Sequence, residues 1–185
     1  MRRSTNDTPT VFLEMVHHTE SGLIFLACAR MSSRLLWLPP GGNFNATGIA
    51  RGDGHVATYD ISTGKVTRLR MKDYPGHLAP HGMDVVPSAA DPSKLFVYVV
   101  NHRAPRVGDP KVVGGNSVVD VFETKVGSGV LKYLRTVEDP VIHTPNDVLG
   151  FSDGKSFYVT NDHAFKLGLV SLTVIRPPEC HSFQL

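Results

Sequence analysis

Two apolar runs joined by a turn-forming cluster dominate the middle of the chain. Residues 83–86 alternate apolar and polar side chains, whereas residues 95–100 form a continuous β-branched and aromatic run. The segment between them is rich in Pro, Ser and Asp, which is typical of a turn between antiparallel strands. His81 precedes the first run and His102 follows the second. A hairpin of this length is therefore predicted to bring the two histidines together at one rim of a sheet.

The same arrangement recurs on either side, in residues 13–29 and 146–163. Glu14, Asp84 and Asp147 each introduce the first apolar run of a unit. Further segments between the units alternate apolar and polar positions, as half-exposed strands do; they are 55–62, 65–71, 116–125 and 129–137. Four antiparallel strands per repeated unit predict the blades of a β-propeller. The fold expected is all-β, a partial propeller of about two and a half blades.

The remaining segments set the expected domain limits. Residues 1–10 are expected to be a disordered N-terminus, and residues 11–163 to form the partial propeller. The Gly- and Pro-rich segments 39–53 and 103–115 are expected as loops within it. Residues 164–185 are expected to be an unrelated tail without a pairing partner. Because propellers close with about four to eight blades, an open strand edge through which copies self-associate is also expected.

Composition excludes several classes of partner. The formal net charge is +2 and the charges of both signs are interspersed, which argues against nucleic acid. No apolar run approaches the roughly 20 residues of a membrane span, and the N-terminus lacks the apolar core of a signal peptide. Localisation stays open. Cys28 lies in an apolar run and is expected as a buried thiol, and a disulfide with Cys180 is left open.

Four motifs give the chain a recognisable character. They are PHGMDV at 80–85, VYVVNH at 97–102, PNDV at 145–148 and FYVTNDH at 157–163. In this order they resemble the paraoxonase/arylesterase family, over residues 11 to 163. The resemblance implies a six-bladed propeller that hydrolyses aryl esters and lactones with calcium, of which this chain spans about the first half.

The resemblance also implies roles for single residues. His81 is similar to the general base of that family, and His102 to the second histidine of its dyad. Asn146 resembles a ligand of the catalytic calcium. Asp147 and the backbone carbonyl of Met83 resemble ligands of a second, structural calcium.

The first unit departs from the family pattern, which has a Glu-Asp pair at this point. Aligned on the Ser-Gly-Leu turn, the chain has Leu13 at the catalytic position and Glu14 at the structural one. A slip of one residue would give Glu14 the catalytic role instead, so one of the two carboxylates is missing in either alignment.

These motifs also have simpler interpretations. An Asn-Asp pair before a strand forms an Asx turn without any metal, and a histidine at a rim is often merely solvated. A Ser-His-Asp hydrolase is disfavoured because no G-x-S-x-G sequence occurs. Two hypotheses follow. The chain is a calcium-dependent ester or lactone hydrolase of reduced or no activity, or it is a non-catalytic scaffold that binds calcium at most.

Overall fold

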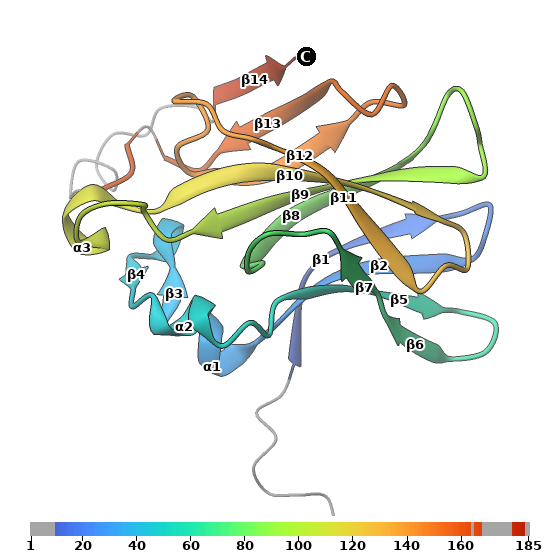
Figure 1. Ribbon diagram of the computed structural model, residues 1–185, viewed down its shortest axis with the longest axis horizontal. Coiled ribbons are helices and arrows are strands. Elements are labelled where there is room, and N and C mark those ends of the chain that lie inside the picture. The colour runs from blue at the N-terminus through green and yellow to red at the C-terminus, as the bar shows by residue number, and fades with distance from the viewer. Residues whose placement is uncertain (1–9, 164, 168–178, 184–185) are drawn as a thin grey trace, which may run out of the picture.

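Three β-sheets, antiparallel except for one strand pair, lie one above another in the computed structural model (Figure 1). The structure describes residues 10–163, 165–167 and 179–183, so most of the segment predicted as an N-terminal arm lies outside it. Its all-β architecture confirms the partial β-propeller predicted from the repeat. The domain limits expected within the chain remain a prediction.

The first sheet contains the four strands predicted for the first unit, in the order β1-β2-β5-β6. Its strands are β1 (Thr10–His18), β2 (Leu23–Arg30), β5 (His55–Asp60) and β6 (Lys65–Arg68). Residues 25–29 of β2 are buried, and β6 is largely exposed, as expected for the centre and edge of a sheet. Cys28 is buried and free, as predicted, while the side chain of Cys180 lies outside the description.

The second sheet has one strand more than predicted, in the order β7-β11-β10-β9-β8. The strands are β7 (Arg70–Lys72), β8 (Pro80–Pro87), β9 (Lys94–Arg103), β10 (Asn116–Lys125) and β11 (Val130–Val137). The prediction of one strand over 65–71 is wrong, because the chain leaves the first sheet at Leu69. This side chain is 2% exposed in the core, and the next residue donates its N–H to the Gly129 carbonyl. β7 then runs parallel to β11.

The third sheet extends the predicted hairpin by one strand, in the order β12-β13-β14. These strands are β12 (Pro145–Gly150), β13 (Phe157–Asn161) and β14 (Glu179–Phe183). The expectation of a tail without a pairing partner is therefore wrong. β13 would otherwise present a row of unpaired backbone groups, and antiparallel pairing with β14 satisfies them.

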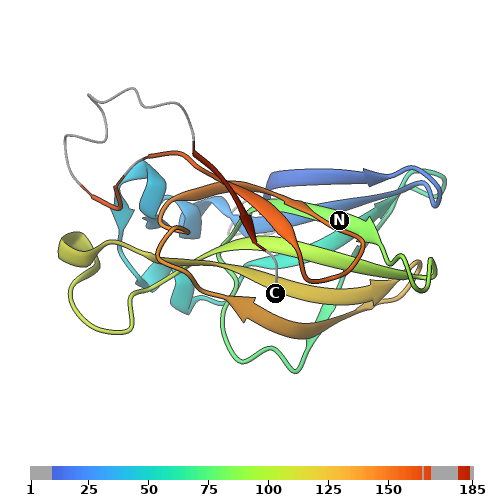
Figure 2. The same cartoon turned by 90° about the horizontal axis from the view of Figure 1, so that it is seen from above.

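Short helices and a two-stranded ribbon interrupt the predicted loops. Within the connection from β2 to β5, called here the β2–β5 segment (residues 31–54), lie α1 (Met31–Arg34), β3 (Trp37–Leu38), η1 (Pro39–Gly41), β4 (Asn43–Phe44) and α2 (Thr47–Ala50). The other loop contains α3 (Pro110–Val113). These elements gather at the end of the sheets where β9 ends (Figure 2). No helix in the described part is long and apolar enough to cross a membrane.

Two hydrophobic cores lie on opposite faces of the second sheet. Val97 and Val99 of β9 enter the core shared with the first sheet, beside Phe25. Tyr98 and Val100 enter the core shared with the third sheet. Because successive side chains of a strand point to opposite faces, a continuous apolar run is what a strand between two cores requires. The run at 95–100 is explained by this position.

The first strands of the three units lie side by side, since β8 contacts both β1 and β12. Each has an irregular register at the same place: between Phe12 and Glu14, between Pro80 and Met83, and between Pro145 and Val148. In each case one extra residue is inserted, which is the geometry of a β-bulge. The repeat in the sequence is thus matched by a repeated bulge in the structure.

Gly82 is the point where two of these bulges touch. A Cβ at this position would overlap the carbonyl oxygen of Asn146 and the Cα of Asp147. We expect Gly82→Ala to destabilise the fold by about 1–3 kcal/mol, because the backbones of β8 and β12 have to separate. Chemical denaturation monitored by tryptophan fluorescence measures this change.

The matched control is Gly129→Ala. Gly129 is exposed, and a Cβ there meets no atom within 4 Å. It is expected to leave the free energy of unfolding within about 0.5 kcal/mol of the wild type. Equal effects of the two substitutions would contradict the close approach of the two bulges.

Candidate functional site

His81 and His102 meet as predicted from the hairpin. His81 lies in the bulge at the start of β8 and His102 near the end of β9. The Nδ1 atom of His81 lies 3.0 Å from the Nε2 atom of His102, and the rings meet edge to face. His102 is completely buried, whereas His81 keeps part of its surface exposed. The two rings therefore form a hydrogen-bonded dyad in which only the outer member is within reach of a substrate.

Ser117 extends the dyad to a third residue. Ser117 lies on β10 opposite His102 of β9; its Oγ is 2.9 Å from the Nδ1 atom of His102, and its side chain is 3% exposed. A hydroxyl can donate or accept, so it fixes whichever tautomer of His102 the dyad adopts. The sequence analysis misses Ser117, since the register across the loop before β10 depends on that loop's conformation.

Asn101 positions the dyad through the loop that leads into β8. Its Oδ1 accepts the N–H of Ala79, and its Nδ2 donates to the carboxylate of Asp120, at 2.8 Å in each case. Asp120 is itself fully buried, and it also accepts from Tyr74 and Thr136. A buried carboxylate needs such donors to remain in the core. The network fixes the loop that leads into β8, and with it His81.

Asn161 makes an equivalent set of hydrogen bonds in the third sheet. Asn161 is 2% exposed, accepts the N–H groups of His143 and Thr144, and donates to the Val141 carbonyl. Asn101 and Asn161 occupy equivalent positions, because they pair with Pro80 and Pro145 just before each bulge. The amide of each residue ties its own sheet to the loop that leads into it.

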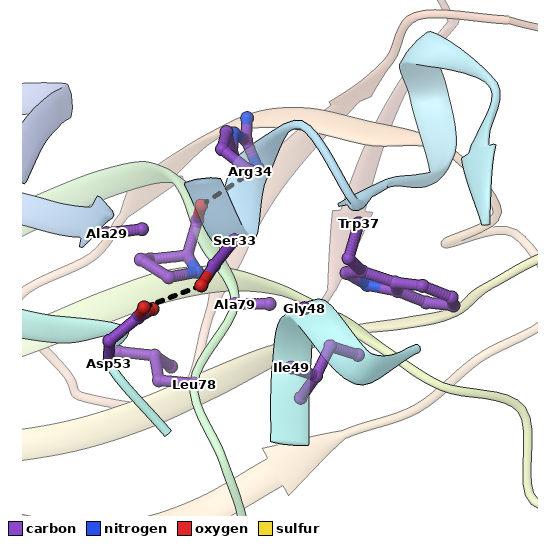
Figure 3. A pocket seen from close by; sticks show the side chains of 10 residues that line it. Ala29, Ser33, Arg34, Trp37, Gly48, Ile49, Asp53, Leu78 and Ala79 are labelled. Atoms are coloured by element: carbon purple, nitrogen blue, oxygen red, sulfur yellow. Dashed lines mark hydrogen bonds between the residues drawn. The ribbon is translucent and has the colours of Figure 1, made fainter. Parts of the chain in front are cut away.

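The β2–β5 segment covers the dyad. Trp37 donates its Nε1–H to the carbonyl of His102 at 2.6 Å, and the carbonyl of Pro40 lies 3.2 Å from the Nε2 atom of His163. Arg34 donates to the Pro80 carbonyl at 3.4 Å, next to His81 (Figure 3). Trp37 and Arg34 have no counterpart in the repeat, and no spacing in the sequence indicates them. A single segment thus reaches from the first sheet to the third.

Burial keeps both histidines neutral. Desolvation, followed by the nearby positive charge of Arg34, lowers the pKa of His81 from 6.5 to about 4. Desolvation, then the charges of His81 and Arg34, lowers the pKa of His102 well below its usual value. At pH 7 the dyad is therefore uncharged, which is the protonation state that a general base needs.

The predicted metal residues lie on the inner strands, but they do not all face one point. Glu14, Met83, Asp84 and Asp147 line one cavity of about 440 Å³, whereas Asn146 does not line it. The bulges equate Glu14 with Asp147, so the register supports the alignment on the Ser-Gly-Leu turn. In that alignment Leu13 is the counterpart of Asn146.

In the part of the chain that the structure describes, calcium binding by these residues stays a prediction. No group of three or more His, Cys, Asp or Glu side chains there is placed to hold one ion. Instead, the carboxylates of Glu14, Asp84 and Asp147 each accept the N–H of the following residue. Burial first, and then the charges of Glu14 and Asp84, raise the pKa of Asp147. The charges of Glu14 and Asp84 thus disfavour ionised Asp147, and no reaction step is assigned to a metal here.

Comparison with known proteins gives one finding. A family model described as Arylesterase matches residues 49–177, more than half of the chain and including both histidines of the dyad. No curated protein matches the chain.

Neutral buried histidines make stability depend on pH. Both rings have a lower pKa in the folded chain than their unfolded value of about 6.5, so the unfolded chain takes up protons first. The contribution of neutral His81 to the free energy of unfolding is fully present above about pH 6.5. It is lost as the pH falls from there to about 4, by on the order of 2–3 kcal/mol. Differential scanning fluorimetry between pH 7 and pH 4 measures the loss.

His81→Gln is expected to weaken this dependence, because the substituted side chain does not titrate. His17→Gln changes an exposed side chain of β1 and is the control. An unchanged pH dependence in His81→Gln would show that His81 is not held neutral by the fold.

Repulsion in the carboxylate cavity predicts that Asp147→Asn is stabilising. A raised pKa means that the ionised form is disfavoured in the folded state, so its removal at pH 7 helps folding. Asp147 is exposed, and solvent screening limits the expected rise in unfolding midpoint to about 1–2 °C. The rise should shrink in a Glu14→Gln background, which removes part of the repulsion.

The same variants test calcium. Millimolar calcium is expected to leave the midpoint of the wild type unchanged, because a ligand stabilises only if it binds the folded form. A rise that Asp147→Asn abolishes would contradict this expectation and show that the carboxylates bind calcium.

Proposed function

Because this chain belongs to the arylesterase family, we propose that it acts on carboxylic esters or lactones and that His81 activates the attacking water. The observation that carries the proposal is the 3.0 Å contact between the rings of His81 and His102. Membership of the family supports the class of ester hydrolase. The substrate and the extent of activity belong to the proposal.

The dyad has one tautomer that suits a base. When His81 Nδ1 carries the proton and donates it to His102 Nε2, the lone pair of His81 Nε2 remains available. His102 then carries its own proton on Nδ1 and donates it to Ser117 Oγ. Ser117 is compatible with the competent tautomer because its hydroxyl can accept that hydrogen bond, and it orients the His102 ring.

The proposed reaction balances with water and the ester as reactants and His81 as the base. Water forms a bond to the acyl carbon while its proton passes to His81 Nε2, giving a tetrahedral oxyanion. The oxyanion collapses, the bond from the acyl carbon to the leaving oxygen breaks, and that oxygen takes the proton back from His81. A general base of this kind contributes roughly 10²–10⁴ to a rate where its geometry is right.

Activity is proposed to be weak. A preorganised donor at an oxyanion is worth about 10²–10³ in rate, and the described residues assemble no calcium ligand set to supply this term. The low pKa of His81, about 4, also makes its imidazole a poor proton acceptor at neutral pH.

A non-catalytic scaffold is the alternative. It is favoured by the same observation on the carboxylates, which accept backbone N–H groups of their own strands instead of converging on one point. In that case the dyad is a structural hydrogen bond that closes the rim of the second sheet. The two functions differ in what the removal of His81 does to hydrolysis.

The hydrolysis of phenyl acetate and γ-butyrolactone by the purified chain tests the proposal. We expect rates close to the buffer background, with a small excess that His81→Gln removes and that a chelator does not change. Ser117→Ala is expected to reduce the excess, because His102 loses the acceptor that orients it.

Each other result has a clear meaning. Calcium-dependent turnover that a chelator abolishes would contradict the incomplete metal site. An excess that persists in His81→Gln would exclude His81 as the base. No measurable excess in any variant would favour the scaffold.

A further inference from the structure

The guanidinium of Arg34 has no carboxylate partner among the described residues. Arg34 is the last residue of α1 in the β2–β5 segment, and its side chain is only partly exposed. Its one hydrogen bond in the described part is the long contact of 3.4 Å from Nη1 to the Pro80 carbonyl. No ion pair joins Arg34 to a carboxylate among the described residues, so most donors of its guanidinium have no protein partner.

Four other arginines of the described part have protein partners, although the Nε atoms of Arg103 and Arg135 are buried without one. Arg103 and Arg106 both pair with Glu138, and Arg135 donates to the Gly154 carbonyl. Arg51, in the same segment as Arg34, is exposed and donates to Ser32 Oγ. Arg34 alone among these five combines partial burial with a free guanidinium face.

The nearest carboxylate in the segment is engaged elsewhere. Asp53 lines the same small cavity as Arg34, but its Oδ2 accepts the hydroxyl of Ser33 at 2.6 Å (Figure 3). This bond holds the C-terminal half of α1, and the bond from Trp37 to His102 fixes the chain that follows the helix. The position of Arg34 is therefore set by the fold, independently of any partner for its charge.

The electrostatic state of Arg34 agrees with this geometry. Burial lowers its pKa to about 10, and no neighbouring negative charge opposes the shift. Its own charge reaches the dyad, where it contributes to the lowered pKa values of His81 and His102. The surroundings of the dyad thus contain a positive charge that no carboxylate of the described residues pairs with.

We propose that Arg34 binds a carboxylate beside His81: the acid that hydrolysis of an ester or lactone releases. The inference rests on the proposed function for the identity of this anion. A guanidinium matches a carboxylate with two parallel hydrogen bonds, which a compact cation such as ammonium does not provide. The same group faces the oxyanion that precedes the acid, so Arg34 also stabilises charge as it develops on the acyl group.

Titration with acetate and with 4-hydroxybutyrate, the acid formed from γ-butyrolactone, tests binding. The full chain is titrated at constant ionic strength, with chloride as the comparison anion, and the ring signals of His81 and His102 are followed by NMR. We expect both carboxylates to shift these signals saturably. Arg34→Met is expected to weaken binding about tenfold or more, the usual value of a charged hydrogen bond.

Two further variants make the test specific. Arg51→Met removes an exposed arginine of the same segment and should leave binding unchanged. Arg34→Lys keeps the charge without the planar fork, and intermediate binding is expected; it also serves if Arg34→Met fails to fold. Equal shifts with chloride, or equal affinity in Arg34→Met and the wild type, would overturn the inference.

Binding and turnover are separated by design. Saturable carboxylate binding that requires Arg34, without any hydrolysis, would refute the proposed function and leave the binding site standing. Hydrolysis that requires His81, with carboxylate inhibition unchanged in Arg34→Met, would leave the proposed function standing and refute the role of Arg34.

Discussion

Strand β9 is covered on both faces, because alternate residues of it enter two different hydrophobic cores. A strand in this position has to be apolar along its length, and polar residues at its end become buried with it. Asn101 and His102 are both 0% exposed, so every polar atom of their side chains needs a partner. Their hydrogen bonds tie together the loop before β8, the dyad and Ser117. The candidate site is therefore formed by the hydrogen bonds that the buried polar side chains at the end of β9 require.

Local periodicity was sufficient to predict most of the strands. It was less able to predict how the chain passes from one sheet to the next. The hairpin of β8 and β9 was predictable, since its register depends only on one turn and one apolar run. The transfer at Leu69 and the pairing of β14 were not, because both depend on which edge of a sheet is open. Trp37 and His102 are 65 residues apart, and no local pattern reports a contact of that kind.

The carboxylates show the same limit at the level of chemistry. Glu14, Asp84 and Asp147 reach the walls of one cavity although Asp84 lies two positions further along its strand than Asp147, because residues two apart on a strand face the same way. Ligation demands more, since oxygen atoms have to converge within about 2.3–2.6 Å of one ion. That convergence depends on the spacing between neighbouring strands, which Gly82 controls by its contact with Asp147. Sequence reasoning located the residues and could not supply their distances.

The transfer of the chain at Leu69 has a consequence for how such a protein is inherited. β6 forms the outer edge of the first sheet, and β7, which begins after the single intervening residue Leu69, forms the outer edge of the second. The repeat in the sequence and the sheet in space therefore do not begin at the same residue. The second sheet includes β7, which lies before the second repeated unit in the sequence. A blade exchanged between relatives at the obvious border, the loop before β8, would arrive without its outermost strand. The border that preserves whole sheets runs through Leu69, inside what looks like a single strand.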